Sequence, residues 1–271
     1  NVVGLNETIT CKGTWDTLSP PARCWIAPNG SHGPLDISGA IEHSCNYFFY
    51  EVGYRLSRNN GVYDSDTGLE KLAYYADQFG LSDKSGVEIS ESAPKVSDFD
   101  AIRSAIGQGT NNYSTVGLAR YVTTVANSGS CYNLSLLSKA TDADGNLIAD
   151  YTPTLRNTVD LKQSTWDAIH QGMRKVVEDK DYYKDLTIQV AGKTGTAQEN
   201  RKRANHALFV CYAPYEQPQI AIATRIAFGY ASDYAAQVTK DIVKYYFKLE
   251  DESSLITGTA ESTNVVQSAG D

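Results

Sequence analysis

The sequence predicts an α+β protein in which an antiparallel β-sheet is flanked by helices. Three apolar segments, residues 187–197, 206–215 and 218–228, follow one another closely and are joined by short polar or proline-containing turns. Segments with helical spacing of apolar residues precede and follow them, at 161–179 and 232–250. Consecutive strands late in the chain favour an antiparallel sheet over alternating parallel βαβ units.

The N-terminal part places a short polar sequence between two helical pieces. Residues 1–35 are rich in Gly, Pro, Asn and Ser, which is typical of a loop region. Asp36 can act as the N-cap of a helix at 37–44, and apolar residues recur at helical spacing over 47–56. The sequence Ser-Cys-Asn at 44–46 is therefore expected at the junction of two helical pieces.

The next segment predicts a helix followed by a polar connection. The helix is expected at 66–80, with Asp66 or Thr67 as its cap and Gly80 as its stop. Residues 81–98 are expected to form a polar loop with one short strand.

The remaining segments have clear local signals. A turn rich in glycine and asparagine at 106–114 precedes a helix at 114–129, which Ser114 can cap. Residues 134–151 alternate in polarity around an aspartate–glycine pair, which is typical of a hairpin. Residues 250–271 are small, polar and aperiodic, so we expect a disordered tail after a domain that spans residues 1–249.

Composition excludes some classes of function. The chain has 271 residues and a formal net charge of -8, which argues against a nucleic-acid partner, whose phosphates need a basic surface. No apolar run approaches the length of a transmembrane helix, and the N-terminus has neither the features of a signal peptide nor an initial Met. The chain is interpreted as a fragment, and a membrane anchor is expected only in the parent protein.

The cysteines and histidines do not predict a metal site. Cys11 and Cys24 lie thirteen residues apart in a loop-like region and could form a disulfide in an oxidising compartment, whereas Cys45 and Cys211 have the apolar context of buried thiols. There is no C-x-x-C sequence and no Cys/His pairing, so neither zinc nor another cofactor is expected. The histidines are scattered through the chain: His32, His43, His170 and His206.

The sequence AGKTGTAQ at residues 191–198 raises the question of what Lys193 binds. A phosphate-binding P-loop needs a glycine at position 187, where the chain has Thr187, and a helix after the lysine, where the chain continues into a strand. A carboxylate is the better ligand, because a lysine on a strand can present a point charge beside the neighbouring hydroxyls.

Strand alternation places Lys193 and Gly195 on one face and Thr194 and Thr196 on the other. A bulge or an edge position would let the threonine hydroxyls turn toward a cleft, and Gly195 would let a ligand approach the backbone closely. For the K-T-G sequence alone, a plain hairpin with a glycine bend is the favoured interpretation, because three-residue motifs recur by chance.

The S-x-N sequence at 44–46 changes that interpretation. The Ser44 hydroxyl can relay a proton, and the Asn46 amide can hold a substrate amide, although both residue types are also common in caps and turns. S-x-N upstream of K-T-G matches two of the three motifs of the penicillin-recognising serine acyltransferases.

The chain resembles the transpeptidase domain of class B penicillin-binding proteins, and the penicillin-binding protein 2 type linked to cell elongation most of all. The resemblance covers residues 11–248. It rests on stretches in the family's order and spacing: CW at 24–25, SHGPLDISGAIEHSCNYFFYEVGYRL at 31–56, SAIGQGTNNYSTVGLARYVTTVANSG at 104–129 and VAGKTGTAQ at 190–198.

Two features depart from the family. After GQGT the family usually has Thr-Pro, where this chain has Ser114-Thr115. The family's nucleophile sequence S-x-x-K should precede S-x-N, and nothing before Ser44 fits it. Residues 92–95 read S-A-P-K, but they follow S-x-N, and Pro94 blocks the helical turn that would align serine and lysine. The chain is therefore expected to begin just after the nucleophile helix and to be inactive alone.

The resemblance implies the penicillin-binding protein and β-lactamase-like fold and a role for each matched residue. Ser44, helped by Lys193, would pass a proton to the leaving nitrogen, and Asn46 would hold the peptide amide. Thr194 and Thr196, beside Gly195, would bind the terminal carboxylate, and the Thr196 N–H would donate to the oxyanion.

The implied activity is peptidoglycan D,D-transpeptidation through an acyl-serine on the extracytoplasmic face of a bacterial membrane. Expected partners are stem peptides ending in D-Ala-D-Ala, β-lactam antibiotics and cell-elongation proteins, with no metal or cofactor. A β-lactam sensor, a β-lactamase and a non-catalytic scaffold of the same fold are the alternatives.

Overall fold

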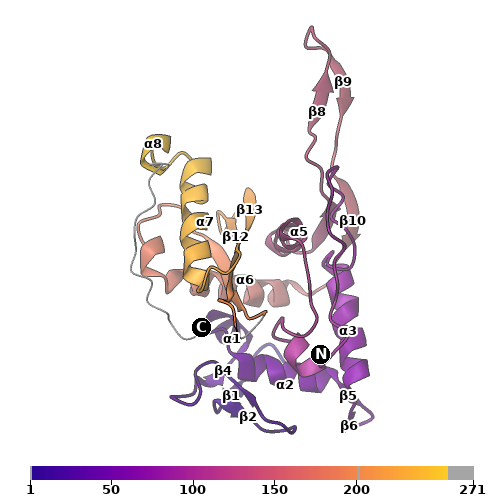
Figure 1. The fold of residues 1–271 in the computed structure, drawn as a ribbon, viewed down its shortest axis with the longest axis vertical. Helices are drawn as coiled ribbons and strands as arrows, with labels where there is room; N and C mark the ends of the chain where they lie inside the picture. The colour runs from indigo at the N-terminus through magenta and orange to yellow at the C-terminus, as the bar shows by residue number, and fades with distance from the viewer. Residues whose placement is uncertain (1, 200–201, 256–271) are drawn as a thin grey trace. The chain divides into compact units, whose positions relative to one another are not determined.

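The computed structural model describes residues 2–199 and 202–255, which fall into two compact units. One unit comprises residues 3–49 and 167–255, and the other comprises Val2 and residues 50–166. Figure 1 shows the order of helices and strands along the chain. The predicted domain of residues 1–249 thus contains two compact units, and each is described separately below.

The first unit contains the predicted antiparallel sheet. Its strands are β11 (Ala191–Ala197), β12 (His206–Ala213) and β13 (Ile220–Ile226), in the order β11-β12-β13. The register between β11 and β12 runs without a shift and places Lys193 opposite Val210. Among the described strands, β11 pairs only with β12, so it is an edge strand, and its register with β12 contains no bulge. Of the two arrangements considered for this strand, a bulge or an edge position, the structure shows the edge position.

Helix α7 (Ser232–Tyr246) packs along this sheet (Figure 1). Ala235 and Val243 of the helix and Phe209 and Cys211 of β12 belong to one cluster and are at most 1% exposed. Such close packing means that β12 cannot shift without leaving a cavity. The core therefore fixes β12, and the hydrogen-bonded ladder fixes β11 beside it. Two further helical segments precede β11 in the chain, namely α6 (Gln163–Glu178) and η1 (Asp181–Tyr183).

The N-terminal segment contains short strands where the sequence predicted only a loop. Strand β1 (Ile9–Cys11) pairs with β4 (Gly33–Leu35), and β2 (Thr14–Trp15) pairs with β3 (Ala22–Arg23). Strands of two or three residues are too short to show a periodic pattern.

The two helices around residues 44–46 confirm the sequence prediction. Helix α1 (Ile37–Glu42) begins after Asp36, whose carboxylate accepts a hydrogen bond of 2.8 Å from the Gly39 N–H. Helix α2 (Asn46–Leu56) begins three residues after the α1 C-cap.

The second unit contains a further set of helices and strands. They are β5 (Arg58–Asn59), β6 (Val62–Tyr63), α3 (Ser65–Gln78), α4 (Ala101–Ser104), α5 (Thr115–Ala126), β7 (Ser130–Asn133), β8 (Lys139–Thr141), β9 (Leu147–Asp150) and β10 (Thr154–Thr158). The Ser114 cap of α5 and the β8–β9 hairpin are confirmed. The β5–β6 and β7–β10 pairs and helix α4 were not predicted.

Two predictions in this unit were wrong in detail. The cap of α3 is Asp64, which accepts from the Asp66 N–H and the Thr67 hydroxyl, so both residues named as caps are its donors. The strand expected within 81–98 is a single bridge between Lys95 and Asn112.

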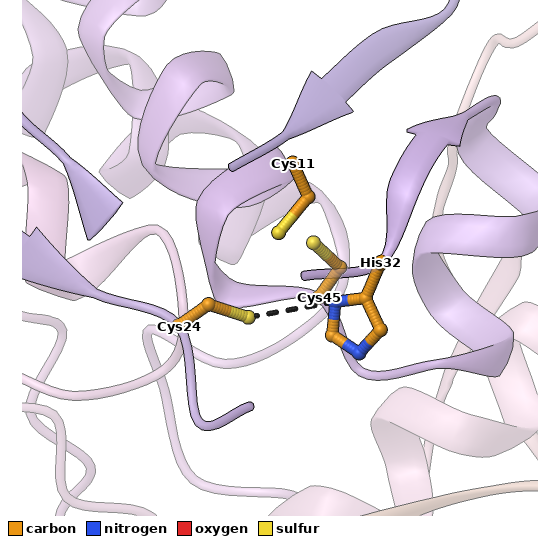
Figure 2. Close-up of side chains that lie close together, drawn as sticks. All are labelled: Cys11, Cys24, His32 and Cys45. Atoms are coloured by element: carbon orange, nitrogen blue, oxygen red, sulfur yellow. Dashed lines mark hydrogen bonds between the residues drawn. The ribbon is translucent and has the colours of Figure 1, made fainter. Parts of the chain in front are cut away.

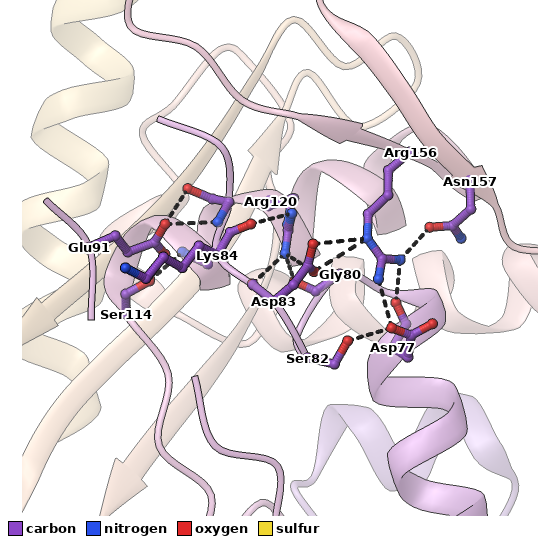
Figure 3. A network of polar contacts seen from close by, with 12 residues as sticks. Asp77, Gly80, Ser82, Asp83, Lys84, Glu91, Ser114, Arg120, Arg156 and Asn157 are labelled. Atoms are coloured by element: carbon purple, nitrogen blue, oxygen red, sulfur yellow. Dashed lines mark hydrogen bonds and ion pairs between the residues drawn. The ribbon is translucent and has the colours of Figure 1, made fainter. Parts of the chain in front are cut away.

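A buried arginine joins several segments of this unit (Figure 3). Arg120 of α5 is fully buried and donates to the carbonyl of Gly80 and to the Asp83 carboxylate, the latter at 2.8 Å. Arg156 of β10 contacts the same aspartate and donates to Asp77 at 2.6 Å. A Cβ at Gly80, whose φ is +72°, would lie 2.7 Å from Arg120 Nε, which explains the glycine at this helix end.

The described residues cover only the start of the expected disordered tail, residues 250–255. A one-turn helix, α8 (Glu252–Leu255), forms where the tail was expected to lack regular structure, and residues 256–271 lie outside the described residues. No described helix is both long enough and apolar enough to span a membrane.

Candidate functional site

Ser44 adopts a backbone conformation that L-residues rarely take. Its φ is 50°, and it follows directly on the C-cap of α1. Its N–H donates to the Ile41 carbonyl at 3.2 Å, and the Cys45 N–H donates to the Ala40 carbonyl at 2.9 Å. These paired bonds form a Schellman helix end, in which glycine usually occupies the position of Ser44. The turn therefore holds a hydroxyl where the backbone alone favours glycine, at a cost of about 1–3 kcal/mol.

Lys193 reaches this hydroxyl from the edge strand β11. Its Nζ donates to Ser44 Oγ at 2.9 Å and to the Thr194 carbonyl at 3.0 Å, and it lies 3.4 Å from Thr194 Oγ1. An ammonium group has donors only, so Ser44 Oγ accepts in this contact. The serine proton therefore remains available to a different acceptor.

The two glycines of β11 have different surroundings. A Cβ at Gly192 would lie 2.5 Å from Phe209 Cζ and 2.8 Å from the Val210 carbonyl oxygen, so the packing of the sheet requires glycine there. A Cβ at Gly195 would meet only Leu208 Cβ, at an ordinary 3.5 Å. The internal packing of the protein leaves Gly195 unexplained, which agrees with the sequence argument that a ligand approaches the backbone at this point.

Two further predicted site residues, Asn46 and Thr196, lie two and three residues along the chain from Ser44 and Lys193. Asn46 is half-buried as the first residue of α2, and in the described part of the chain its amide makes no hydrogen bond. Thr196 lies two residues beyond Thr194 on β11. The structure thus brings together Ser44, Lys193 and Thr194, with Asn46 and Thr196 on the adjoining elements.

A separate cavity lies at the end of β13 beside α7. Its volume is about 500 Å³, and aromatic side chains including Phe228, Tyr230 and Tyr234 line it. None of the six predicted site residues belongs to its lining. The Ser44–Lys193 contact therefore lies outside this cavity, at the edge strand β11.

The sequence reasoning missed a cluster of side chains that could bind a metal ion (Figure 2), and one of them, Cys45, directly follows Ser44 in the chain. One ligand atom each from Cys11, Cys24, His32 and Cys45 lies within 4.8 Å of the others. Cys11 ends β1, Cys24 follows β3, His32 precedes β4 and Cys45 lies between α1 and α2. The expectation that no Cys/His pairing exists was wrong, because the short strands fold distant residues together. Spacings of 13, 8 and 13 residues match no familiar zinc sequence.

The chemistry of the cluster fits a zinc ion. Three cysteines and one histidine form a familiar structural zinc set, and tetrahedral ligands about 2.3 Å from the metal would lie roughly 3.8 Å apart. His32 Nδ1 lies 3.6 Å from Cys24 Sγ, and His32 Nε2 is buried without a hydrogen-bond partner in the described residues. The hydrogen bond between Cys24 and Cys45 lowers the pKa of the Cys24 thiol and raises that of the Cys45 thiol, so it favours one thiolate in the cluster, at Cys24. All three cysteines are buried and free, so the disulfide considered for Cys11 and Cys24 is not formed.

Known proteins resemble this chain over most of its length. A family model described as the penicillin binding protein transpeptidase domain matches residues 1–244. The peptidoglycan D,D-transpeptidase MrdA of Haemophilus influenzae is 28% identical over 284 residues, which cover 91% of this chain and 41% of the relative. The chain thus spans about two fifths of the length of that curated relative.

Solved structures share the fold. Penicillin-binding protein 2B of Streptococcus pneumoniae strain R6 has a TM-score of 0.78 at 24% identity, covering 92% of this chain and 45% of that one. The imipenem acyl-enzyme complex of penicillin-binding protein A from M. tuberculosis has a TM-score of 0.76 at 20% identity, covering 90% of this chain and 55% of that one. The predicted α+β fold is confirmed.

Proposed function

The chain belongs to the penicillin-binding protein transpeptidase domain family. We propose that its S-x-N sequence at 44–46 and its K-T-G sequence at 193–195 form two sides of the acyl-transfer site of a peptidoglycan D,D-transpeptidase. The contact of 2.9 Å between Lys193 Nζ and Ser44 Oγ carries this proposal, because it joins the S-x-N and K-T-G sequences in one polar site. The nucleophilic serine would come from an S-x-x-K sequence on the N-terminal side of residue 1.

Ser44 would deliver the proton that the leaving group needs. The nucleophilic serine attacks the carbonyl of the penultimate D-Ala, an ester forms, and the terminal D-Ala leaves as an amine that must gain a proton. Because Lys193 donates to Ser44 Oγ, the Ser44 hydroxyl can donate its proton to that nitrogen and regain one from the Lys193 ammonium. The proton that the nucleophilic serine loses would restore the ammonium. An amine of a second stem peptide then attacks the ester, forms the cross-link and releases the serine.

The edge of β11 would bind the donor peptide. The Lys193 ammonium and the Thr194 and Thr196 hydroxyls would hold the terminal carboxylate, and Asn46 would hold the peptide amide. Gly195 would leave room for the substrate backbone, as its open surroundings suggest. The Thr196 N–H would be one oxyanion donor.

Intact-mass measurement tests this proposal. The protein with its own upstream residues would be incubated with benzylpenicillin, beside a Lys193→Met variant. We expect one stable drug adduct on the natural protein and much slower formation on the variant. No adduct on a folded natural protein would favour a scaffold, and rapid loss of the adduct as hydrolysed drug would favour a β-lactamase.

A second candidate function is binding of structural zinc by Cys11, Cys24, His32 and Cys45, which the proximity of their ligand atoms supports. A bound ion would cross-link the N-terminal strands to the residue after Ser44. We expect metal analysis of the natural protein to find one zinc per chain and a Cys24→Ser variant to lose it. Cys131→Ser, which alters a buried cysteine of the other unit, is the matched control. Equal zinc content in all three proteins would contradict this assignment.

The cellular setting follows from the same proposal. Stem peptides ending in D-Ala-D-Ala and β-lactams would be the ligands, cell-elongation proteins the partners, and the extracytoplasmic face of the membrane the location. A sensor would bind the drug equally well but would not cross-link peptides, so turnover of a donor and an acceptor peptide separates the two.

A further inference from the structure

Trp25 binds the peptide group that leads into Ser44. Its indole Nε1 donates to the His43 carbonyl at 3.1 Å, across 18 residues of sequence. The side chain is 41% exposed, whereas Trp15 and Trp166 are 1% and 2% exposed. Burial in a core therefore explains the other two tryptophans but does not explain Trp25.

The His43 carbonyl belongs to a peptide plane that has a hydrogen bond at each end. The N–H of the same plane is that of Ser44, and it donates to the Ile41 carbonyl. The plane is thus held at both ends, by Trp25 on its oxygen and by the helix end on its nitrogen. Carbonyls at a helix end lack partners within the helix, so an external donor matters here.

Rotation of this plane is the simplest way for Ser44 to leave its strained conformation. A flip of about 180° would change the Ser44 φ of +50° to roughly -130°, which is an ordinary extended value for L-residues. The same flip would break the bonds to Trp25 and Ile41, so the helix end that fixes the position of Ser44 beside Lys193 would be lost. The net free energy of one hydrogen bond is comparable to the strain that it opposes.

Ring contacts hold the indole in place. The Trp25 and His32 rings are 5.3 Å apart, and the His32 and His43 rings are stacked at 5.7 Å with an interplanar angle of 10°. Aromatic pairs at such distances are favourable. The donor therefore approaches the His43 carbonyl from a fixed direction.

We propose that Trp25 is a positioning residue for the acyl-transfer reaction, which holds the Ser44 hydroxyl toward Lys193 by fixing the peptide plane between His43 and Ser44. The inference rests on the proposed function of Ser44. It assigns Trp25 no contact with substrate.

A double-mutant cycle tests the proposal on the protein with its own upstream residues. The rate of acylation by a fluorescent penicillin would be measured for the natural protein, Trp25→Phe, Ser44→Ala and the double variant. We expect Trp25→Phe to slow acylation about fivefold, the effect of one hydrogen bond, and to have less than a twofold effect once the Ser44 hydroxyl is absent. Tyr75→Phe, a comparably exposed aromatic at 45%, should change nothing.

The outcomes separate this inference from the proposed function. Absence of acylation in the natural protein would refute the proposed function. Normal acylation with no effect of Trp25→Phe, or an equal effect with and without the Ser44 hydroxyl, would refute positioning. If the Phe variant unfolds, benzothienylalanine at position 25 keeps the ring shape and replaces only the N–H, and the same fivefold slowing is expected.

Discussion

Ser44 and Lys193 are separated by 149 residues of sequence, yet Lys193 Nζ donates to Ser44 Oγ at 2.9 Å. Different causes position the two residues. Ser44 occupies the glycine position of a Schellman helix end, and Lys193 lies on an edge strand whose neighbour β12 is fixed by the core under α7. The Ser44 hydroxyl is thus held at a backbone position where glycine would be the more stable residue.

The strained serine leads to a prediction about stability. Ser44→Gly and Ser44→Ala both remove the hydroxyl, but only glycine relieves the positive φ. We expect the Gly variant to have a free energy of unfolding about 1 kcal/mol higher than the Ala variant, with both poorly acylated. Urea denaturation of the two variants measures the difference, and an Ala variant of equal or greater stability would contradict the strain argument.

The two glycines of β11 predict opposite outcomes. Gly195→Ala should fold normally, because its Cβ finds ordinary space, but should slow acylation at least tenfold if substrate passes over the strand. Gly192→Ala should lower the melting temperature, because its Cβ would collide with Phe209 and the Val210 carbonyl. Thermal melts and acylation rates of both variants provide the check. A normal acylation rate in Gly195→Ala would remove the argument for a ligand at this strand.

Acid stability should depend on Asp77. The Ser82 hydroxyl and then Arg156 lower the pKa of its carboxyl group below 3.8. A depressed pKa contributes stability above the unfolded pKa, and that contribution is lost as pH falls through the folded pKa. We expect Asp77→Asn to be less stable than the natural protein at pH 7, with the difference shrinking below about pH 4. Glu70→Gln, on the same helix, is the control, and a difference independent of pH would argue against this linkage.

Metal removal should affect the turn that carries Ser44. If zinc joins Cys45 to the N-terminal strands, a chelator should lower the melting temperature and slow acylation together, and added zinc should restore both. The measurement is a pair of melts and acylation rates before and after chelation. Unchanged values after verified metal loss would show that the cluster does not support the site.

The sequence predicted those parts of the protein that local signals encode. The Asp36 and Ser114 caps and the three strands around Lys193 follow from residue type and periodicity over several residues, whereas the choice between a bulge and an edge position for β11 needed the structure. The short N-terminal strands have no such period, and the cysteine–histidine cluster depends on them, so neither was predictable. The Ser44–Lys193 proximity was expected from resemblance, but the strained helix end behind it needed the structure.

The coupling between Ser44 and Lys193 is the most direct test of the account. Acylation rates by penicillin would be measured for Ser44→Ala, Lys193→Met and the double variant, in the protein with its own upstream residues. We predict that each single variant is slowed about a hundredfold or more and that the double variant is hardly slower than either, because the two residues act as one unit. Independent effects that multiply in the double variant would contradict the claim that this hydrogen bond joins them in one step.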